Sequence, residues 1–119
     1  MSTIHLFDNV GDAVVYPAGT VIFLEGEPGD CMYAVVEGEV EILLGDTVVD
    51  STGPGGIVGE MAVIDAGPRS ATCRAKTDVR LVAVNQRRFL FLVQQTPFFA
   101  VQVMKILSDR HRRRLAAIR

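Results

Sequence analysis

Short hydrophobic runs separated by polar turn residues fill the chain between residues 13 and 84. The runs have two to six residues, and they are Val14–Tyr16, Val21–Leu24, Met32–Val36, Val40–Leu44, Val48–Val49 and Val79–Val84. Nine of the 11 glycines lie between Gly19 and Gly59, where they punctuate these runs. Glycine supplies the positive φ that tight turns require, so the pattern predicts many short strands. Such a chain is typical of a sandwich, jelly roll or small barrel.

Acidic residues alternate with apolar or small residues between Glu37 and Leu44. The three acids are Glu37, Glu39 and Glu41, and they are followed in turn by Gly, Val and Ile. A period of two describes a strand with one face in water. The alternation therefore predicts a strand within Glu37–Leu44 with one face in water.

The character of the sequence changes near residue 85, where two helices are predicted. Asn85 is suited to cap a helix over Gln86–Gln95. Thr96-Pro97 reads as a cap followed by proline at the first helical position, and this second helix can run to the end of the chain. Its apolar stripe, at 3-4-4-3 spacing, is Met104, Leu107, His111, Leu115 and Ile118. A stripe of this kind is more often a core or dimer seam than a cofactor site.

The chain contains no linker, repeat or low-complexity stretch, so we expect a single domain over residues 1–119. The β roll occupies about 13–84 and the C-terminal helices about 86–119. Hydrophobic residues make up 49% of the chain and charged residues 22%, a globular composition. No apolar run is long enough to span a membrane, and no secretory signal is recognisable at the N-terminus. We therefore expect a cytoplasmic protein.

The cysteines and histidines exclude several kinds of chemistry. Cys31 and Cys73 form no CxxC pair, and in the cytoplasm we expect them to be reduced. His5 and His111 are the two histidines, and they lie near opposite ends of the chain. Such a pair argues against a histidine-based metal centre and a Ser-His-Asp triad. We expect no metal, no cofactor and no enzymatic activity.

Charge is distributed unevenly along the chain. Residues 105–119 carry six basic side chains and one acidic side chain, whereas residues 1–104 carry six basic and 13 acidic ones. A basic run at the end of a helix is most often a solvated face, and it can also contact nucleic acid, an anionic membrane or an acidic partner. No aromatic residues interleave with the arginines to stack on bases, which favours the solvated face.

The segment Gly53–Ala75 carries the strongest chemical signal. Its glycine-rich loop opens into a short predicted helix over Glu60–Asp65, which Gly67-Pro68 ends, and Arg69 begins a new strand-like run. Unpaired N–H groups at a helix start attract anions, and an arginine presents a permanently charged fork to a phosphate. The alternative is a simple ion pair between Glu60 and Arg69 across the turn.

With these motifs, the chain resembles the cyclic nucleotide-binding domain of bacterial catabolite-activator-type regulators, kinase regulatory subunits and cyclic-nucleotide-gated channels. One half of the resemblance lies in PAGTVIFLEGEPGDCMYAVVEGEVEI, whose glycines occupy the family's turn positions. The other half lies in VGEMAVIDAGPRSAT, which is similar to the family's phosphate-binding cassette. The resemblance implies a mainly β fold, a double-stranded β-helix or jelly roll, with a short phosphate-cassette helix and two C-terminal helices.

The resemblance also implies a role for individual residues. Arg69 would pair with the exocyclic oxygens of a cyclic phosphate, and Glu60 would accept a hydrogen bond from the ribose 2′-OH. Gly59 would let the backbone approach the sugar closely. The remaining contacts to the phosphate would come from the backbone N–H groups of Met61, Ala62 and Ala71 and from the hydroxyl of Ser70.

Fewer residues indicate which nucleotide base the site prefers. In the family, a threonine after the arginine helps to recognise guanine, so Ser70 favours cAMP over cGMP without excluding cGMP. The last helix covers the base in many relatives, and the candidate capping residues are Arg110, His111 and Arg114. A solvent-facing helix end is the alternative for at least two of these three.

Three functions are compatible with the sequence. The leading hypothesis is a cyclic-nucleotide sensor that relays occupancy through its C-terminal helices to an effector protein, with a homodimer through the last helix as one arrangement. The second is a ligand-free interaction scaffold with a basic C-terminal helix. The third is binding of nucleic acid or an anionic surface through residues 110–119, although no DNA-binding helix-turn-helix is recognisable in this chain.

Overall fold

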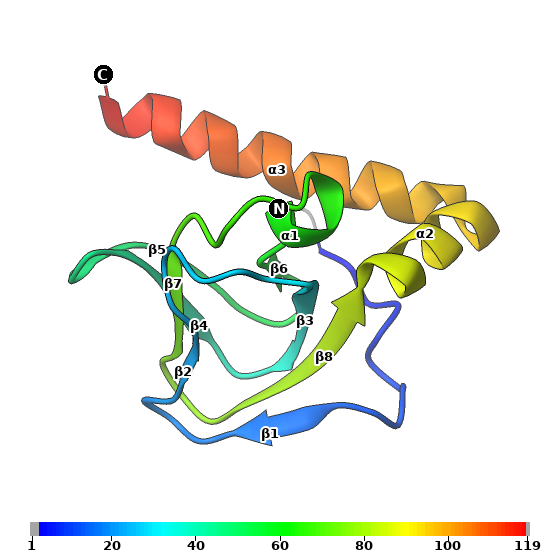
Figure 1. Cartoon of the computed structure of the whole chain (residues 1–119), viewed down its shortest axis with the longest axis horizontal. Helices are drawn as coiled ribbons and strands as arrows, with labels where there is room; N and C mark the ends of the chain where they lie inside the picture. The colour runs from blue at the N-terminus through cyan, green and yellow to red at the C-terminus, as the bar shows by residue number, and fades with distance from the viewer. Residues whose placement is uncertain (1–2, 119) are drawn as a thin grey trace.

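The structure, a computed structural model, describes residues 3–118 and consists of two four-stranded antiparallel sheets with helices at one end (Figure 1). The first sheet has the order β1 (Val14–Tyr16), β8 (Val79–Asn85), β3 (Cys31–Glu37) and β6 (Ile57–Val58). The second has the order β2 (Val21–Phe23), β7 (Thr72–Ala75), β4 (Val40–Leu44) and β5 (Thr47–Thr52). The helices are α1 (Met61–Ile64), α2 (Gln86–Gln95) and α3 (Pro97–Ile118). The predicted jelly roll with a short helix and two C-terminal helices is confirmed.

The first sheet is buried on both faces because its two central strands separate two hydrophobic cores. On one face, Val35 of β3 and Leu81 of β8 pack in the core between the sheets. On the other face, Met32 and Val84 pack in the core beneath the helices. Alternate positions of β3 and β8 therefore serve different cores, as the period of two in a strand requires.

Phe99 fixes α3 on the first sheet. Its ring is fully buried and makes edge contacts with Phe89 of α2 and with Phe7 of the N-terminal segment. The backbone N–H of Ile4 donates to the carbonyl of Gly55 at 2.6 Å, which ties this segment to the roll. The N-terminal part of α3 is thus packed between the N-terminal segment of the chain, α2 and the first sheet.

The strand predicted within Glu37–Leu44 is confirmed over Val40–Leu44, and the alternation at Glu37–Glu39 belongs to a turn between two strands. β3 ends at Glu37 and β4 begins at Val40, and the two strands belong to different sheets. Gly38 turns the chain between them with a φ of +82°, and a Cβ atom there would collide with the carbonyl oxygen of Asp78. The acidic alternation thus arose from two strand ends and a turn that only glycine fits.

The predicted starts of both C-terminal helices are confirmed. The Asn85 side chain accepts a hydrogen bond from the Arg88 backbone N–H at 2.8 Å, and α3 begins at Pro97 directly after Thr96. The expected continuation of α3 to Arg119 lies outside the described residues. Within residues 3–118, no single helix could cross a membrane by length and apolar composition; α2 and α3 pass that test only as a pair bent by 116°.

Candidate functional site

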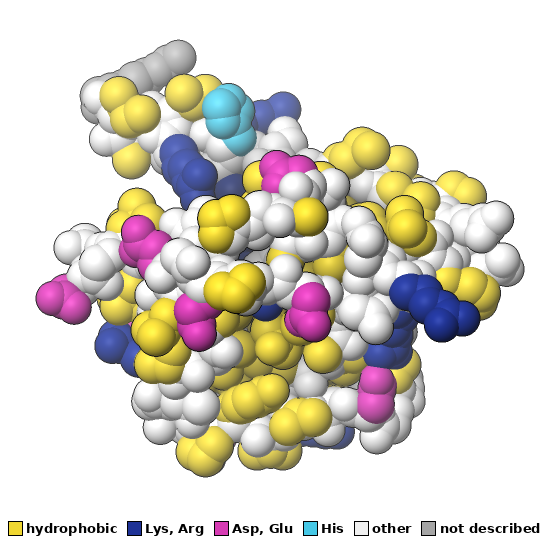
Figure 2. Space-filling view, viewed as in Figure 1, with side chains coloured by type: hydrophobic (Ala, Val, Ile, Leu, Met, Phe, Trp, Pro, Cys, Tyr) yellow, Lys and Arg dark blue, Asp and Glu magenta, His cyan; other side chains and the backbone are white. Residues whose placement is uncertain are grey.

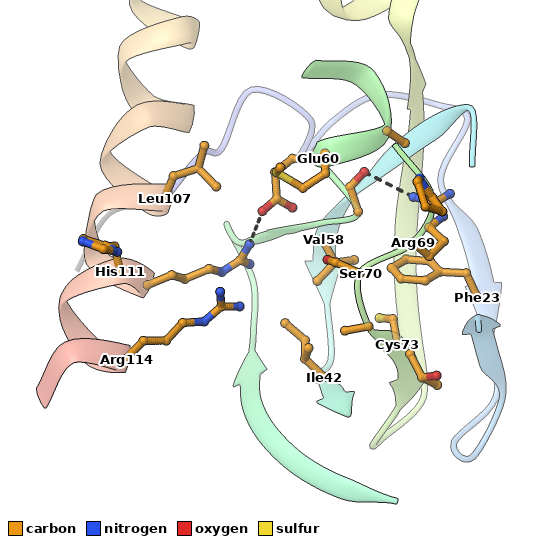
Figure 3. A pocket seen from close by; sticks show the side chains of 17 residues that line it. Phe23, Ile42, Val58, Glu60, Arg69, Ser70, Cys73, Leu107, His111 and Arg114 are labelled. Atoms are coloured by element: carbon orange, nitrogen blue, oxygen red, sulfur yellow. Dashed lines mark hydrogen bonds and ion pairs between the residues drawn. The ribbon is translucent and has the colours of Figure 1, made fainter. Parts of the chain in front are cut away.

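A cavity of about 290 Å³ lies between the second sheet, the start of α1 and α3 (Figure 3). The cassette segment, both sheets and α3 all contribute side chains to its wall. Its lining residues are Phe23, Ile42, Val58, Gly59, Glu60, Met61, Ala62, Pro68, Arg69, Ser70, Ala71, Thr72, Cys73, Leu107, Arg110, His111 and Arg114. Every residue that the sequence proposed for the phosphate, the ribose and the base cap therefore lines one cavity.

Gly59 brings the cassette backbone into contact with the cavity. Its φ of +72° is a conformation that side chains disfavour, and a Cβ atom there would collide with the Arg69 guanidinium. The helix that follows is α1, whose N-cap is Glu60 and whose C-cap is Asp65. The predicted helical segment is thus confirmed at its core, with both predicted end residues serving as caps.

Arg69 is buried, with 7% of its surface exposed, at the side of the cavity formed by the cassette. Its Nη1 donates to the Gly59 carbonyl at 3.2 Å, and its Cζ lies 4.1 Å from the centre of the Phe23 ring. Its Nε is buried and has no hydrogen-bond partner among the described residues. A buried donor on a cation without a partner is costly, so this atom points to an anion that the site is built to accept.

The backbone around Arg69 is fixed by the loop between β2 and β3. The Arg69 N–H donates to the Glu27 carbonyl, and the Gly26 N–H donates to the Arg69 carbonyl, each at 2.8 Å. Gly29 lies directly against the guanidinium, because a Cβ atom there would collide with it. Phe23 and Gly29 are site residues that sequence reasoning missed as neighbours of Arg69, because about 40 positions separate them from it.

Glu60 forms a buried ion pair with α3 rather than with Arg69. Its Oε1 accepts from Arg110 Nη1 at 2.8 Å, and Arg110 Nη2 also donates to the carbonyl of Ile57. Glu60 and Arg110 are only 7% and 8% exposed. Within residues 3–118, the structure thus places the Glu60 carboxylate on Arg110, and the alternative of a Glu60–Arg69 pair is not what the side chains form.

The candidate phosphate contacts lie along one wall of the cavity. Ser70 and Ala71 follow Arg69 in the wall, and Met61 and Ala62 open α1 beside it. The Ala62 N–H donates to the Gly59 carbonyl at 3.2 Å, the same oxygen that accepts from Arg69. A ligand that takes the Ala62 N–H would therefore replace this contact.

The three candidate capping residues differ in their surroundings, although all line the cavity from α3. Arg110 is buried, whereas His111 and Arg114 are exposed at the mouth. Figure 3 shows the Arg114 side chain extending from α3 toward the side of the cavity where Ile42 lies. The predicted stripe is divided between two surroundings, because Leu107 and His111 line the cavity whereas Met104, Leu115 and Ile118 are exposed.

Cys73 forms an apolar part of the cavity wall. Its side chain is fully buried, and burial raises the pKa of its thiol to about 12. The group therefore remains a neutral thiol near pH 7. Both cysteines are free, and the described part of the chain has no cluster of three His, Cys, Asp or Glu side chains able to hold a metal ion.

Several known proteins are similar to this chain in sequence and in fold. A family model described as the cyclic nucleotide-binding domain matches residues 13–96. A cyclic nucleotide-gated potassium channel of Mesorhizobium japonicum is 37% identical over 121 residues, a match that covers 92% of this chain and 34% of the channel. The crystal structure of the catabolite activator protein of Thermus thermophilus has a TM-score of 0.77 at 31% identity and covers 90% of this chain and 53% of that one.

A second solved relative is known in ligand-bound forms. The EAL enzyme Bd1971 in its cAMP-bound and cGMP-bound forms has TM-scores of 0.65 and 0.66 at 36% identity; each match covers 89% of this chain and 29% or 30% of that one. The chain spans about a third of the length of the channel and about half of the activator. The matched model extends over more than half of this chain and includes the whole cassette. The chain belongs to the cyclic nucleotide-binding domain family.

Proposed function

We propose that the chain binds a cyclic nucleotide, cAMP in preference to cGMP, with the cyclic phosphate on Arg69. The observation that carries the proposal is the buried Arg69 guanidinium, whose Nε lacks a partner within the described residues. The guanidinium otherwise contacts one carbonyl and one aromatic face. Because a cation removed from water needs a counter-charge, a singly charged phosphodiester suits the site.

The residues around Arg69 support the proposal of a phosphate site. Ser70, Ala71, Met61 and Ala62 line the same cavity, and we infer that the Ser70 hydroxyl and the backbone N–H groups of the other three contact the phosphate, the Ala62 N–H by leaving the Gly59 carbonyl. Neutral donors of this kind hold an anion without adding a charge of their own. The cassette side of the cavity thus offers the charge of Arg69 together with neutral donors, which suits a singly charged phosphodiester.

Glu60 is suited to hold the ribose. A carboxylate has several acceptor positions, so Glu60 can accept from a ribose 2′-OH while one of its oxygens remains on Arg110. The base would then lie between the apolar wall, which includes Val58 and Cys73, and α3. Arg110, His111 and Arg114 lie where they can contact it.

The preference for cAMP rests on Ser70, which stands at the position after the arginine. The family places a threonine there in sites that recognise guanine, and serine keeps the hydroxyl without the methyl group. Solved Bd1971 forms are named for both cAMP and cGMP, so we infer a difference in affinity rather than exclusion of one nucleotide.

Occupancy would reach an effector protein through α3. The ligand would contact Glu60, and Glu60 is joined to Arg110 of α3 by the buried ion pair. A ligand that binds more tightly when α3 is drawn onto the cavity shifts the population toward that position. The site presents an arginine, a glutamate and amides, which hold a phosphodiester without cleaving it, so we infer a sensor and not an enzyme.

Calorimetric titration with cAMP and cGMP tests this function. We expect saturable binding of both nucleotides, tighter for cAMP, and a loss of at least tenfold in affinity in Arg69→Ala, since a charge-assisted hydrogen bond is worth about 1.5–3 kcal/mol. Arg80→Ala is the matched control, because Arg80 pairs with Glu37 on the surface and does not line the cavity. Folded protein that gives no heat with either nucleotide would instead support the ligand-free scaffold.

A further inference from the structure

The outward face of α3 carries a regular seam, of which only His111 also lines the nucleotide cavity. Its positions follow a 3-4-3-4-3 spacing, the heptad pattern of a helix that packs along another helix. All six are exposed, and we call them the outer stripe: Val101, Met104, Ser108, His111, Leu115 and Ile118. The apolar members are 40%, 63%, 44% and 81% exposed for Val101, Met104, Leu115 and Ile118.

The opposite face of α3 carries the buried residues by which this helix packs on the roll. Its buried residues are Phe99, Val103, Ile106 and Arg110, and after Arg110 every described residue of α3 is exposed. Figure 2 shows hydrophobic and basic side chains together on the end of α3 that projects from the body. An apolar seam on two projecting helical turns gains stability only when another surface covers it.

The charges beside the outer stripe are basic. Lys105 and Arg112, seven residues apart, lie along one edge, and Arg114 lies along the other. The one acidic residue in the described part of α3, Asp109, is half-buried and sits away from the stripe. Neither Lys105 nor Arg112 lines the nucleotide cavity, and the Lys105 ammonium lies 5.3 Å from the centre of the exposed Phe98 ring. Both charges lie beside the stripe, where flanking charges set the choice of partner in paired helices.

These charges disfavour a second copy of this chain as the occupant of the stripe. Two copies packed against each other bring their basic flanks together, whereas a helix with acidic flanks does not. We propose that the outer stripe binds an amphipathic helix of a partner protein whose apolar seam is flanked by Asp and Glu. The proposal goes beyond nucleotide binding and does not depend on it.

A variant of this chain with reversed charges beside the outer stripe can serve as the acidic partner in a binding experiment. The variant Lys105→Glu/Arg112→Glu presents the same stripe with acidic side chains along the edge that carried Lys105 and Arg112. The substitutions lower the formal net charge of the chain from −2 to −6. Sedimentation equilibrium would measure association of each protein alone and of the two mixed. We expect the mixed pair to associate at least tenfold more tightly than either protein alone, although both are negatively charged overall. Raised salt should weaken the mixed pair.

Two controls keep the outcome specific to the stripe. Lys76→Glu/Arg87→Glu makes the same change in net charge at exposed positions outside α3, and we expect no gain when it is mixed with wild type. Met104→Lys/Leu115→Lys on the wild-type partner should abolish the gain, and an unchanged circular dichroism spectrum and melting temperature show that each variant is folded. Wild-type chains that self-associate as tightly as the mixed pair, or a control pair that matches it, would overturn the proposal.

Discussion

At the scale of single residues, the site depends on the close approach of the backbone at two glycines to the Arg69 guanidinium. Gly59 and Gly29 both lie where a Cβ atom would collide with Arg69. Arg69 is held on one side by these glycines and on another by the Phe23 ring. The resemblance predicted Arg69, Glu60 and Gly59 as site residues. It did not predict that Phe23 and Gly29 pack against Arg69, because these residues precede Arg69 by 40 positions or more and only the fold brings them together.

Gly59→Ala tests this close approach. We expect a loss of about 1–3 kcal/mol in the free energy of unfolding from the positive φ, together with at least tenfold weaker cAMP binding because Arg69 is displaced. Gly19→Ala is the matched control, because Gly19 has a φ of +87° and a Cβ atom there would have no neighbour within 4 Å. It should be destabilised without a change in affinity, and equal losses of affinity in the two variants would contradict the role of Gly59.

Cys73 makes a prediction about reactivity. Burial raises the pKa of its thiol from 9.0 to about 12, and the thiolate is the reactive form. In the folded Cys31→Ser variant we therefore expect alkylation of Cys73 by iodoacetamide at pH 8.5 to be roughly a thousandfold slower than in urea, by mass spectrometry. The Cys73→Ser variant, which keeps the half-buried Cys31, should react in the folded state. Fast alkylation of folded Cys73 would show that the cavity wall opens.

At the scale of elements, α3 is joined to the roll by two ion pairs of different kinds. The Arg110–Glu60 pair is buried beside the cavity, whereas Arg113 pairs with Asp50 of β5 at 2.9 Å in a more exposed place. Both pairs join residues at least 50 positions apart. Sequence reasoning placed Arg110 near the base but did not find its partner, because the pairing depends on the path of α3 over α1.

Arg110→Met tests whether α3 carries the signal. The variant removes the link to Glu60 but leaves Arg69 in place, so we expect cAMP to bind still, with an affinity reduced less than in Arg69→Ala. Hydrogen exchange should show that cAMP protects the amides of α3 in wild type and that this protection is lost in Arg110→Met. Arg113→Met, which removes the pair with Asp50, should retain the protection. Protection of α3 that survives in Arg110→Met would contradict a relay through Glu60.

At the scale of the whole molecule, the turn residues and the pattern of hydrophobic runs were sufficient to predict most of the strands and helices. The runs predicted at Val14–Tyr16 and Val40–Leu44 match β1 and β4, and the helix starts predicted after Asn85 and Thr96 match those of α2 and α3. The two-residue strand β6 had no recognisable signal, because Ile57 and Val58 are too few to show a period. The pairing of strands into two sheets likewise depends on contacts distant in sequence.

The most direct test of the central claim is the crystal structure of the chain with bound cAMP. We expect an exocyclic phosphate oxygen within hydrogen-bond distance of Arg69 Nε, the atom that has no partner in the described residues, and the ribose 2′-OH on Glu60. Arg110 should remain close to Glu60 and the base should lie under α3. A nucleotide bound elsewhere, or one in this cavity that leaves Arg69 Nε without a partner, would contradict the account.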